Sequence, residues 1–186
     1  MVSADRLPGL TLNSAVIGAL EAVLPRVAED SVAAIIAEVP AYADPFRGQM
    51  GQNIENAVAT ALGAFLQLVA RAEGSDPLVP MSPALDGAYE LGCGEARSGR
   101  TIDALQSAYR VGARVAWREL SANAVAEGLQ AATIARFAEM VFAYIDELSG
   151  ASVSGHADEL ATAGRVRQRY LDQLAAQLVH GEDLDD

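Results

Sequence analysis

Residues 89–120 read YELGCGEARSGRTIDALQSAYRVGARVAWREL, and this stretch decides the fold. It predicts the end of one helix, a tight corner and a second helix of about five turns. Gly99 stands where a helix ends in the left-handed conformation, which glycine adopts without a Cβ penalty. Thr101 then offers a hydroxyl cap to the next helix, and Asp103 places a negative charge in its first turn.

The second of these helices is expected to carry two different faces. Apolar and small residues recur at spacings of three and four, which predicts an inward face made of Ile102, Leu105, Tyr109, Gly112, Ala116 and Leu120. Arg110, Arg114 and Arg118 recur every four residues on another face. They either pair with acids on a neighbouring helix, the interpretation we favour, or form a site for an anion or a partner. The candidate ligand-binding residues are Tyr109, Arg110, Arg114 and Trp117.

The composition favours one helical domain. The chain has 186 residues, 51% of them hydrophobic and 5% aromatic, a balance that favours close-packed helices over sheets. The net charge of −12 repels a phosphate backbone, so we expect no direct nucleic-acid binding. The single cysteine, Cys93, suits a reducing cytoplasm. We expect no membrane span, because no run of about eighteen apolar residues is present.

Prolines are expected to mark other helix ends. Asn13 or Ser14 can cap a first helix. Pro25 is expected to end or kink this helix, or to start the next one at its first turn. Asp44–Pro45 and Ser82–Pro83 each combine a capping side chain with a proline, so each is expected to begin a helix.

The C-terminal part is expected to form a helical seam. Residues 149–155 contain two glycines and three serines, which predicts a kink or break. Beyond them, apolar and small residues alternate by four and three, the spacing of a coiled coil or an antiparallel bundle. We predict a homodimer through this seam, with contacts at Leu160, Gly164, Leu171, Leu174 and Leu178. The competing arrangement folds the seam back onto its own domain.

The chain shows no catalytic or metal-binding constellation. The acids that follow His156 are interpreted as a solvated helix rather than as metal ligands. Haem would need an axial ligand, and the middle of the chain has no histidine. Tyr89 or Cys93 could substitute in principle, but we expect no cofactor and interpret Cys93 as a buried thiol.

Several segments resemble the N-terminal regulatory domain of actinobacterial PucR/CdaR-type transcriptional regulators. The resemblance rests on Tyr89–Gly92, Gly94–Arg100, Leu105–Ala113 with Trp117, Val39–Tyr42 and Met50–Asn56, and it extends from Val16 to Leu178. That domain is similar in turn to the N-terminal domain of RsbR stressosome proteins, a globin-like helical fold without haem. The resemblance therefore implies an all-α, globin-like helical bundle with long C-terminal helices.

The resemblance also implies a role. It suggests a cytoplasmic, non-catalytic sensory and dimerisation domain that relays a small-molecule or protein signal to a C-terminal DNA-binding domain absent from this chain. We divide the chain into a lead (1–11), the helical domain (12–150), a dimerisation and linker segment (151–180) and an acidic tail (181–186). The alternatives are a dimerisation scaffold without a ligand and a haem or other cofactor sensor. A pocket between the 44–73 helix and the 101–120 helix would distinguish a sensor from a scaffold.

Overall fold

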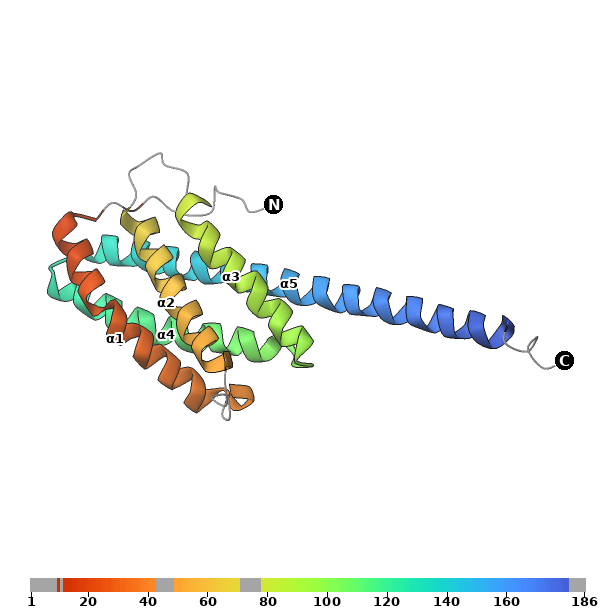
Figure 1. Ribbon diagram of the computed structural model, residues 1–186. Coiled ribbons are helices and arrows are strands. Elements are labelled where there is room, and N and C mark those ends of the chain that lie inside the picture. The colour runs from red at the N-terminus through yellow and green to blue at the C-terminus, as the bar shows by residue number, and fades with distance from the viewer. Residues whose placement is uncertain (1–9, 11, 43–48, 71–77, 181–186) are drawn as a thin grey trace.

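The computed structural model describes residues 10, 12–42, 49–70 and 78–180, and this part of the chain contains helices and no strand (Figure 1). Its elements are α1 (Ser14–Glu38), the short 3-10 helix η2 (Pro40–Tyr42), α2 (Gln49–Ala70), α3 (Leu78–Arg97), α4 (Ile102–Ala126) and α5 (Ala131–His180). The prediction of an all-α bundle is confirmed, with one long C-terminal helix in place of several. The Asp44–Pro45 helix start, the acidic tail and the lead apart from Leu10 lie outside the described residues.

Two glycines turn the chain at the ends of α3 and α4. Gly99 has a φ of +68° and Gly128 a φ of +78°. At the first corner, the N–H groups of Gly99 and Arg100 donate to carbonyls of the last turn of α3, at 3.0 and 2.9 Å. These bonds satisfy carbonyls that a helix end leaves free. The predicted stop at Gly99 is therefore confirmed.

The helix caps agree with the sequence only in part. Asn13 caps α1 as predicted, its side-chain oxygen accepting from the Val16 N–H at 2.9 Å. Thr101 occupies the N-cap position of α4, but its side chain makes no cap hydrogen bond, so the predicted hydroxyl cap is wrong. Thr101 is exposed, and water is available to the free N–H groups in its place. Asp103 lies in the first turn of α4, as predicted.

Two prolines lie inside helices that the sequence predicted to end or begin at them. Pro25 lies in the middle of α1, so the alternatives in which a helix ends or begins at Pro25 are wrong. Proline removes the hydrogen bond to the carbonyl four residues earlier, here that of Glu21. Both Glu21 and Pro25 are exposed, so water can satisfy that carbonyl. Likewise α3 begins at Leu78, before the predicted Ser82–Pro83 start, and Pro83 lies within its early part.

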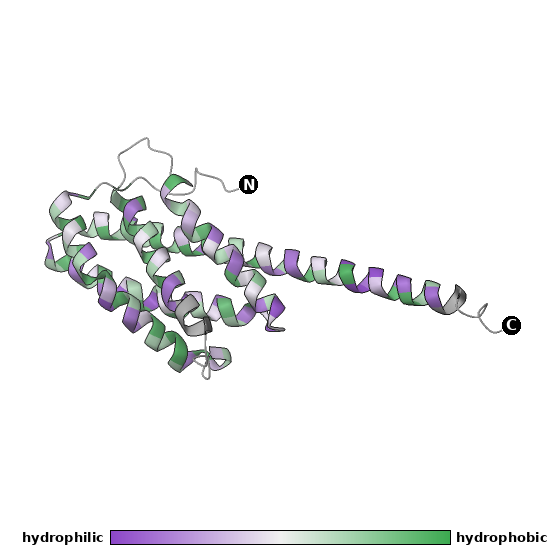
Figure 2. Cartoon of the chain, in the orientation of Figure 1, coloured by the Kyte–Doolittle hydropathy of each residue, from purple (hydrophilic) through white to green (hydrophobic). Residues whose placement is uncertain are grey.

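Helix α5 runs for 50 residues without interruption, so the break predicted within 149–155 is wrong. Ser152 and Gly155 are buried there, which means that these small residues serve helix packing rather than a bend. Farther along, α5 leaves the bundle and projects from it (Figure 1), and every residue from 160 to 177 is exposed. We call residues 160–180 the α5 extension. Figure 2 shows hydrophobic and hydrophilic residues alternating along it.

The close packing of α3 against α5 is the most extensive helix contact in the bundle. A Cβ added to Gly92 on α3 would lie 2.0 Å from the carbonyl oxygen of Ser152, and one added to Gly155 on α5 would lie 2.1 Å from that of Tyr89. Because no side chain fits there, the two backbones touch at this crossing. Gly92 and Gly155 are therefore helix-packing residues.

Aromatic side chains in the core join α2, α4 and α5. The ring centroid of Phe65 on α2 lies 5.6 Å from that of Phe137 and 5.3 Å from that of Tyr144, both on α5. Trp117 on α4 adds a contact with Phe137 at 5.8 Å. Tilted pairs at this separation are a favourable aromatic geometry. A second, smaller cluster packs η2 against α1 and α4 through Ile35, Val39, Tyr42, Ala108 and Val111.

Candidate ligand cavity

A cavity of about 600 Å³ lies among helices α1 to α5 and η2. Members of both hydrophobic clusters line it, including Ile35 of the smaller cluster and Phe65 of the larger one. Its volume is typical of sites for small molecules, which range from about 300 to 1,000 Å³. Since α2 and α4 each supply several lining residues, a pocket lies between these two helices, which is the feature that would distinguish a sensor from a scaffold.

Small residues on the walls create this space. The alanines and glycines that line it are Ala57, Ala61, Ala84, Gly87, Ala88, Gly94, Ala108, Gly112, Ala113 and Ala116. A Cβ added to Gly87 or Gly94 would meet no atom within 4 Å. Larger side chains, among them Phe65, Leu120 and Leu148, complete an apolar lining.

Ser31 lines the cavity and carries a buried polar atom that has no partner. This residue of α1 is 1% exposed, and its hydroxyl oxygen has no hydrogen-bond partner. A buried hydroxyl without a partner costs about 1–3 kcal/mol relative to one that is satisfied. Ser31 lines the cavity, so a bound molecule with a hydrogen-bonding group could remove that cost.

Glu95 is the buried charged residue of the cavity wall, at 4% exposed. Its two carboxylate oxygens accept hydrogen bonds from Arg100 at 2.8 and 2.9 Å, across the α3–α4 corner. Tyr42 on η2 also lines the cavity and lies beside this carboxylate. Burial, then the charge of Glu95 and a hydrogen bond to it, raise the pKa of the Tyr42 hydroxyl well above its usual value. The Glu95 charge is therefore compensated by its own surroundings.

Tyr109 connects the cavity with the α3–α5 crossing. It lines the cavity from α4, and burial raises the pKa of its hydroxyl to about 12. That hydroxyl shares a 2.8 Å hydrogen bond with the Ser152 hydroxyl, which in turn donates to the carbonyl of Ala88 at 2.7 Å. Ser152 is fully buried, so this chain of hydrogen bonds joins α3, α4 and α5 away from water.

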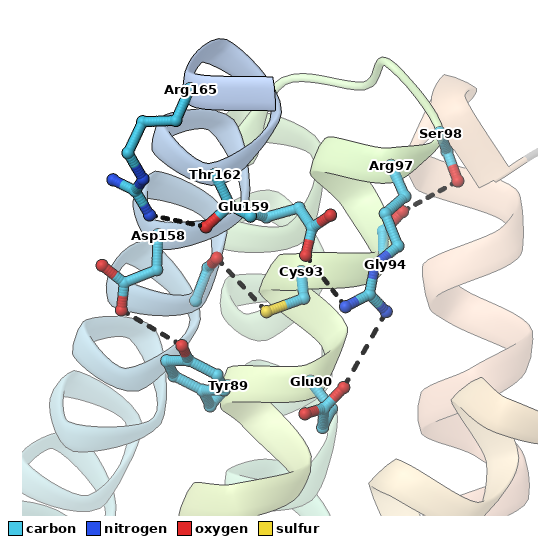
Figure 3. A network of polar contacts seen from close by, with 11 residues as sticks. Tyr89, Glu90, Cys93, Gly94, Arg97, Ser98, Asp158, Glu159, Thr162 and Arg165 are labelled. Carbon is cyan, nitrogen blue, oxygen red and sulfur yellow. Dashed lines mark hydrogen bonds and ion pairs between the residues drawn. The ribbon is translucent and has the colours of Figure 1, made fainter. Parts of the chain in front are cut away.

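A second set of polar contacts ties α3 to the base of the α5 extension (Figure 3). The Tyr89 hydroxyl donates to Asp158 at 3.1 Å, and Arg97 donates to Glu159 at 2.9 Å. The Cys93 thiol is buried and donates to the Gly155 carbonyl at 3.3 Å. Burial raises the pKa of the Cys93 thiol above its usual value. The interpretation of Cys93 as a buried thiol is confirmed.

Of the four predicted ligand-binding residues, Tyr109 lines the cavity and the other three do not. Arg114 is exposed and donates to both carboxylate oxygens of Glu38 on α1. For Arg114, this is the expected pairing with an acid on a neighbouring helix. Arg110 bonds to the Ser107 hydroxyl on its own helix. Trp117 is half-buried and packs on Phe137. A ligand-binding role for these residues stays a prediction.

The predicted dimer residues lie on the α5 extension. The exposed fractions are 53% for Leu160, 50% for Leu171 and 45% for Leu174, and Gly164 is exposed between them. Leu178 lies within α5, but beyond the residues whose side chains the structure describes. None of the described leucines of the seam folds back onto the bundle.

Ser31 and Glu95 were not among the predicted site residues, although the sequence carries a signal for both. Ser31 lies four residues after Val27 and four before Ile35, on the stripe of α1 that is buried. Glu95 continues a buried stripe of α3 that includes Ala84 and Ala88. A polar residue at a predicted core position is the pattern that would have selected both residues as site candidates.

Of the acids that follow His156, Asp158 is exposed, whereas His156 itself packs against the α3–α4 corner. It is half-buried, and its Nε2 lies 3.1 Å from the carbonyl oxygen of Arg100 at the α3–α4 corner. In the described ranges, no three His, Cys, Asp or Glu residues lie together as a metal-binding group. Nor does any helix there have the length and hydropathy to cross a membrane.

The fold and the cavity define an all-α module with an internal apolar site and a projecting helix. Comparison with protein families matches residues 11–181 to the PucR-like N-terminal domain, so the chain belongs to this family. It is thereby related to the regulatory domains of a family of transcriptional regulators, and the match suggests a regulatory role. Comparisons with curated proteins and with solved structures give no match.

Proposed function

We propose that this domain is the sensory and dimerisation part of a cytoplasmic transcriptional regulator, and that it relays occupancy of the cavity to a DNA-binding domain through paired α5 helices. The supporting observation is the continuity of α5. Val141, Tyr144 and Leu148 line the cavity, and the same uninterrupted helix carries the exposed leucines of the extension. A change in the position of α5 at the cavity would therefore move the seam.

The exposed seam supports pairing with a second copy of the chain. Leu160, Leu171 and Leu174 lie on one stripe at coiled-coil spacing and remain accessible to water. Full burial of a leucine contributes roughly 1.5–3 kcal/mol, so pairing two such stripes offers a substantial driving force. A two-fold dimer would also match the paired half-sites that dimeric regulators bind on DNA.

Sedimentation equilibrium tests the pairing. The domain should be a dimer at micromolar concentration, and Leu171→Asp with Leu174→Asp should make it a monomer, because two desolvated carboxylates would face each other across the seam. Gln173→Asp with Ala176→Asp adds the same charge at exposed positions off the stripe and should leave the dimer intact. Circular dichroism would establish that both variants keep their helices. A wild-type monomer at all accessible concentrations would refute the proposal.

A further inference from the structure

We propose that the cavity binds a small, uncharged and largely apolar molecule whose single hydrogen-bonding group pairs with the Ser31 hydroxyl. This inference names the ligand class for the sensory role proposed above and rests on that role for its biological meaning. It is carried by three properties of the cavity: an apolar wall, a compensated charge and one unpaired buried hydroxyl.

The wall requires an apolar ligand. Each of the helices α1 to α5 contributes aliphatic, aromatic or small side chains to it, and alanine and glycine leave open the space next to the backbone. Such a surface gains little from a polar molecule, which would lose its contacts with water on entry.

The charges of the wall exclude an ion. Glu95, which is buried, is bonded twice to Arg100 and lies beside the Tyr42 hydroxyl. Glu90 and Arg97 line the cavity as well, but their side chains are 68% and 57% exposed and form an ion pair 4.0 Å apart. Because each of these charges has an opposite charge beside it, a charged ligand would be desolvated without gaining a counter-ion.

Ser31 marks the place of the ligand's polar group. The hydroxyls of Tyr109 and Tyr144 are already bonded, to Ser152 and to the Ala61 carbonyl, at 2.8 Å each. The Ser31 hydroxyl is the buried side-chain atom without a partner among the described residues. A serine hydroxyl both donates and accepts, so a hydroxyl, amine, amide or carbonyl on the ligand would satisfy it.

A pair of fluorescent probes tests the class of ligand. N-phenylnaphthylamine is neutral and has one N–H group on an aromatic body, and anilinonaphthalene sulfonate carries a sulfonate on the same rings. Titration of the purified domain should show one N-phenylnaphthylamine bound per chain, with a Kd at least about tenfold below that of the sulfonate, because the sulfonate must shed its hydration. Equal affinity for the two probes, or no saturable binding of the neutral one, would overturn the proposal.

Three variants test whether the probe binds in the cavity and beside Ser31. Gly87→Leu fills the cavity and should abolish N-phenylnaphthylamine binding, whereas Gly18→Leu, the same change at an exposed position of α1, should not affect it. Ser31→Ala should raise the Kd about fivefold through the loss of one hydrogen bond. An unchanged Kd in Gly87→Leu or in Ser31→Ala would refute the proposed position of the probe.

The probe-binding test of the cavity can fail independently of the sedimentation test of the dimer. Sedimentation of the same variants reports pairing through the α5 extension, which lies outside the cavity. A dimer that fails to bind the neutral probe refutes the ligand class alone. A monomer that binds the probe refutes the dimeric relay and leaves the cavity assignment in place.

Discussion

Replacing Gly155 by alanine should destabilise the domain, although alanine is the better helix former. Gly155 lies inside α5, where exchange for alanine ordinarily stabilises a helix by about 0.5–1 kcal/mol. Here the new Cβ would lie 2.1 Å from the Tyr89 carbonyl oxygen and 3.2 Å from the Tyr89 Cα. These are backbone atoms of α3, so no side-chain rotation can relieve the clash, and the two helices must separate.

The magnitude follows from what the separation disturbs. Ordinary contact begins at 3.4 Å, so the backbones must move apart by more than an ångström. The Cys93–Gly155 and Ser152–Ala88 hydrogen bonds, at 3.3 and 2.7 Å, cross the same interface and would lengthen. Overpacking in a rigid core costs about 1–3 kcal/mol, and a lost hydrogen bond adds about 1 kcal/mol. After the gain in helix propensity is subtracted, we expect a net loss of about 1–3 kcal/mol.

Urea and thermal unfolding of matched variants would measure the effect. Gly150→Ala is the control, because it makes the same change in α5 at an exposed position where a Cβ meets no atom within 4 Å. We expect Gly150→Ala to raise the Tm slightly and Gly155→Ala to lower it by roughly 2–12 °C for a domain of this size. If Gly155→Ala proves as stable as Gly150→Ala, the close crossing of α3 and α5 is refuted.

Further outcomes are expected from changes elsewhere. Ser152→Ala should lower the free energy of unfolding by about 1–3 kcal/mol because it leaves buried partners unpaired. Ser31→Ala removes a hydroxyl that has no partner and should leave the free energy of unfolding unchanged or raise it. Urea unfolding of both variants would contradict the argument if Ser31→Ala proved the less stable of the two. Cys93 should react with Ellman's reagent at least about tenfold more slowly in the folded domain than in urea, because burial raises its pKa and lowers the fraction of reactive thiolate; equal rates would show that the thiol is accessible. Addition of hemin should give no stoichiometric Soret band, and a band lost on mutating Cys93 or Tyr89 would contradict the expected absence of a haem site. The domain should not retain a promoter fragment at physiological salt, and specific, salt-sensitive retention would contradict the argument from its charge.

Local features of the structure were predictable from the sequence because they depend on neighbours along the chain. Gly99 and Asn13 act at helix ends, where a residue's own φ or side chain satisfies groups within a few positions. The inward face of α4, with Leu105 and Leu120 buried, follows from the helical period alone. The leucine stripe was also visible, because its spacing is a property of a single helix.

Local rules failed where a distant part of the chain decided the result. Pro25 lies within a continuous helix because its face of α1 is exposed, and residues 149–155 form no break because α3 packs tightly against Ser152 and Gly155. A small residue can either bend a helix or allow another helix to pack closely against it. Which of the two occurs depends on the helix that packs there, and the local composition does not specify that helix.

The cavity belongs wholly to the tertiary structure. Ser31, Tyr42 and Glu95 come from three elements, and their common site exists because the helices that carry them surround the same space. The sequence indicated a polar residue on a buried stripe in two of these cases, but not that the residues share one wall. It likewise predicted an arginine stripe on α4, while the position of Glu38 on α1 decided that Arg114 is held in an ion pair. Periodicity specifies which face of each helix turns inward, and only the packing of the helices specifies whether the space between those faces is filled.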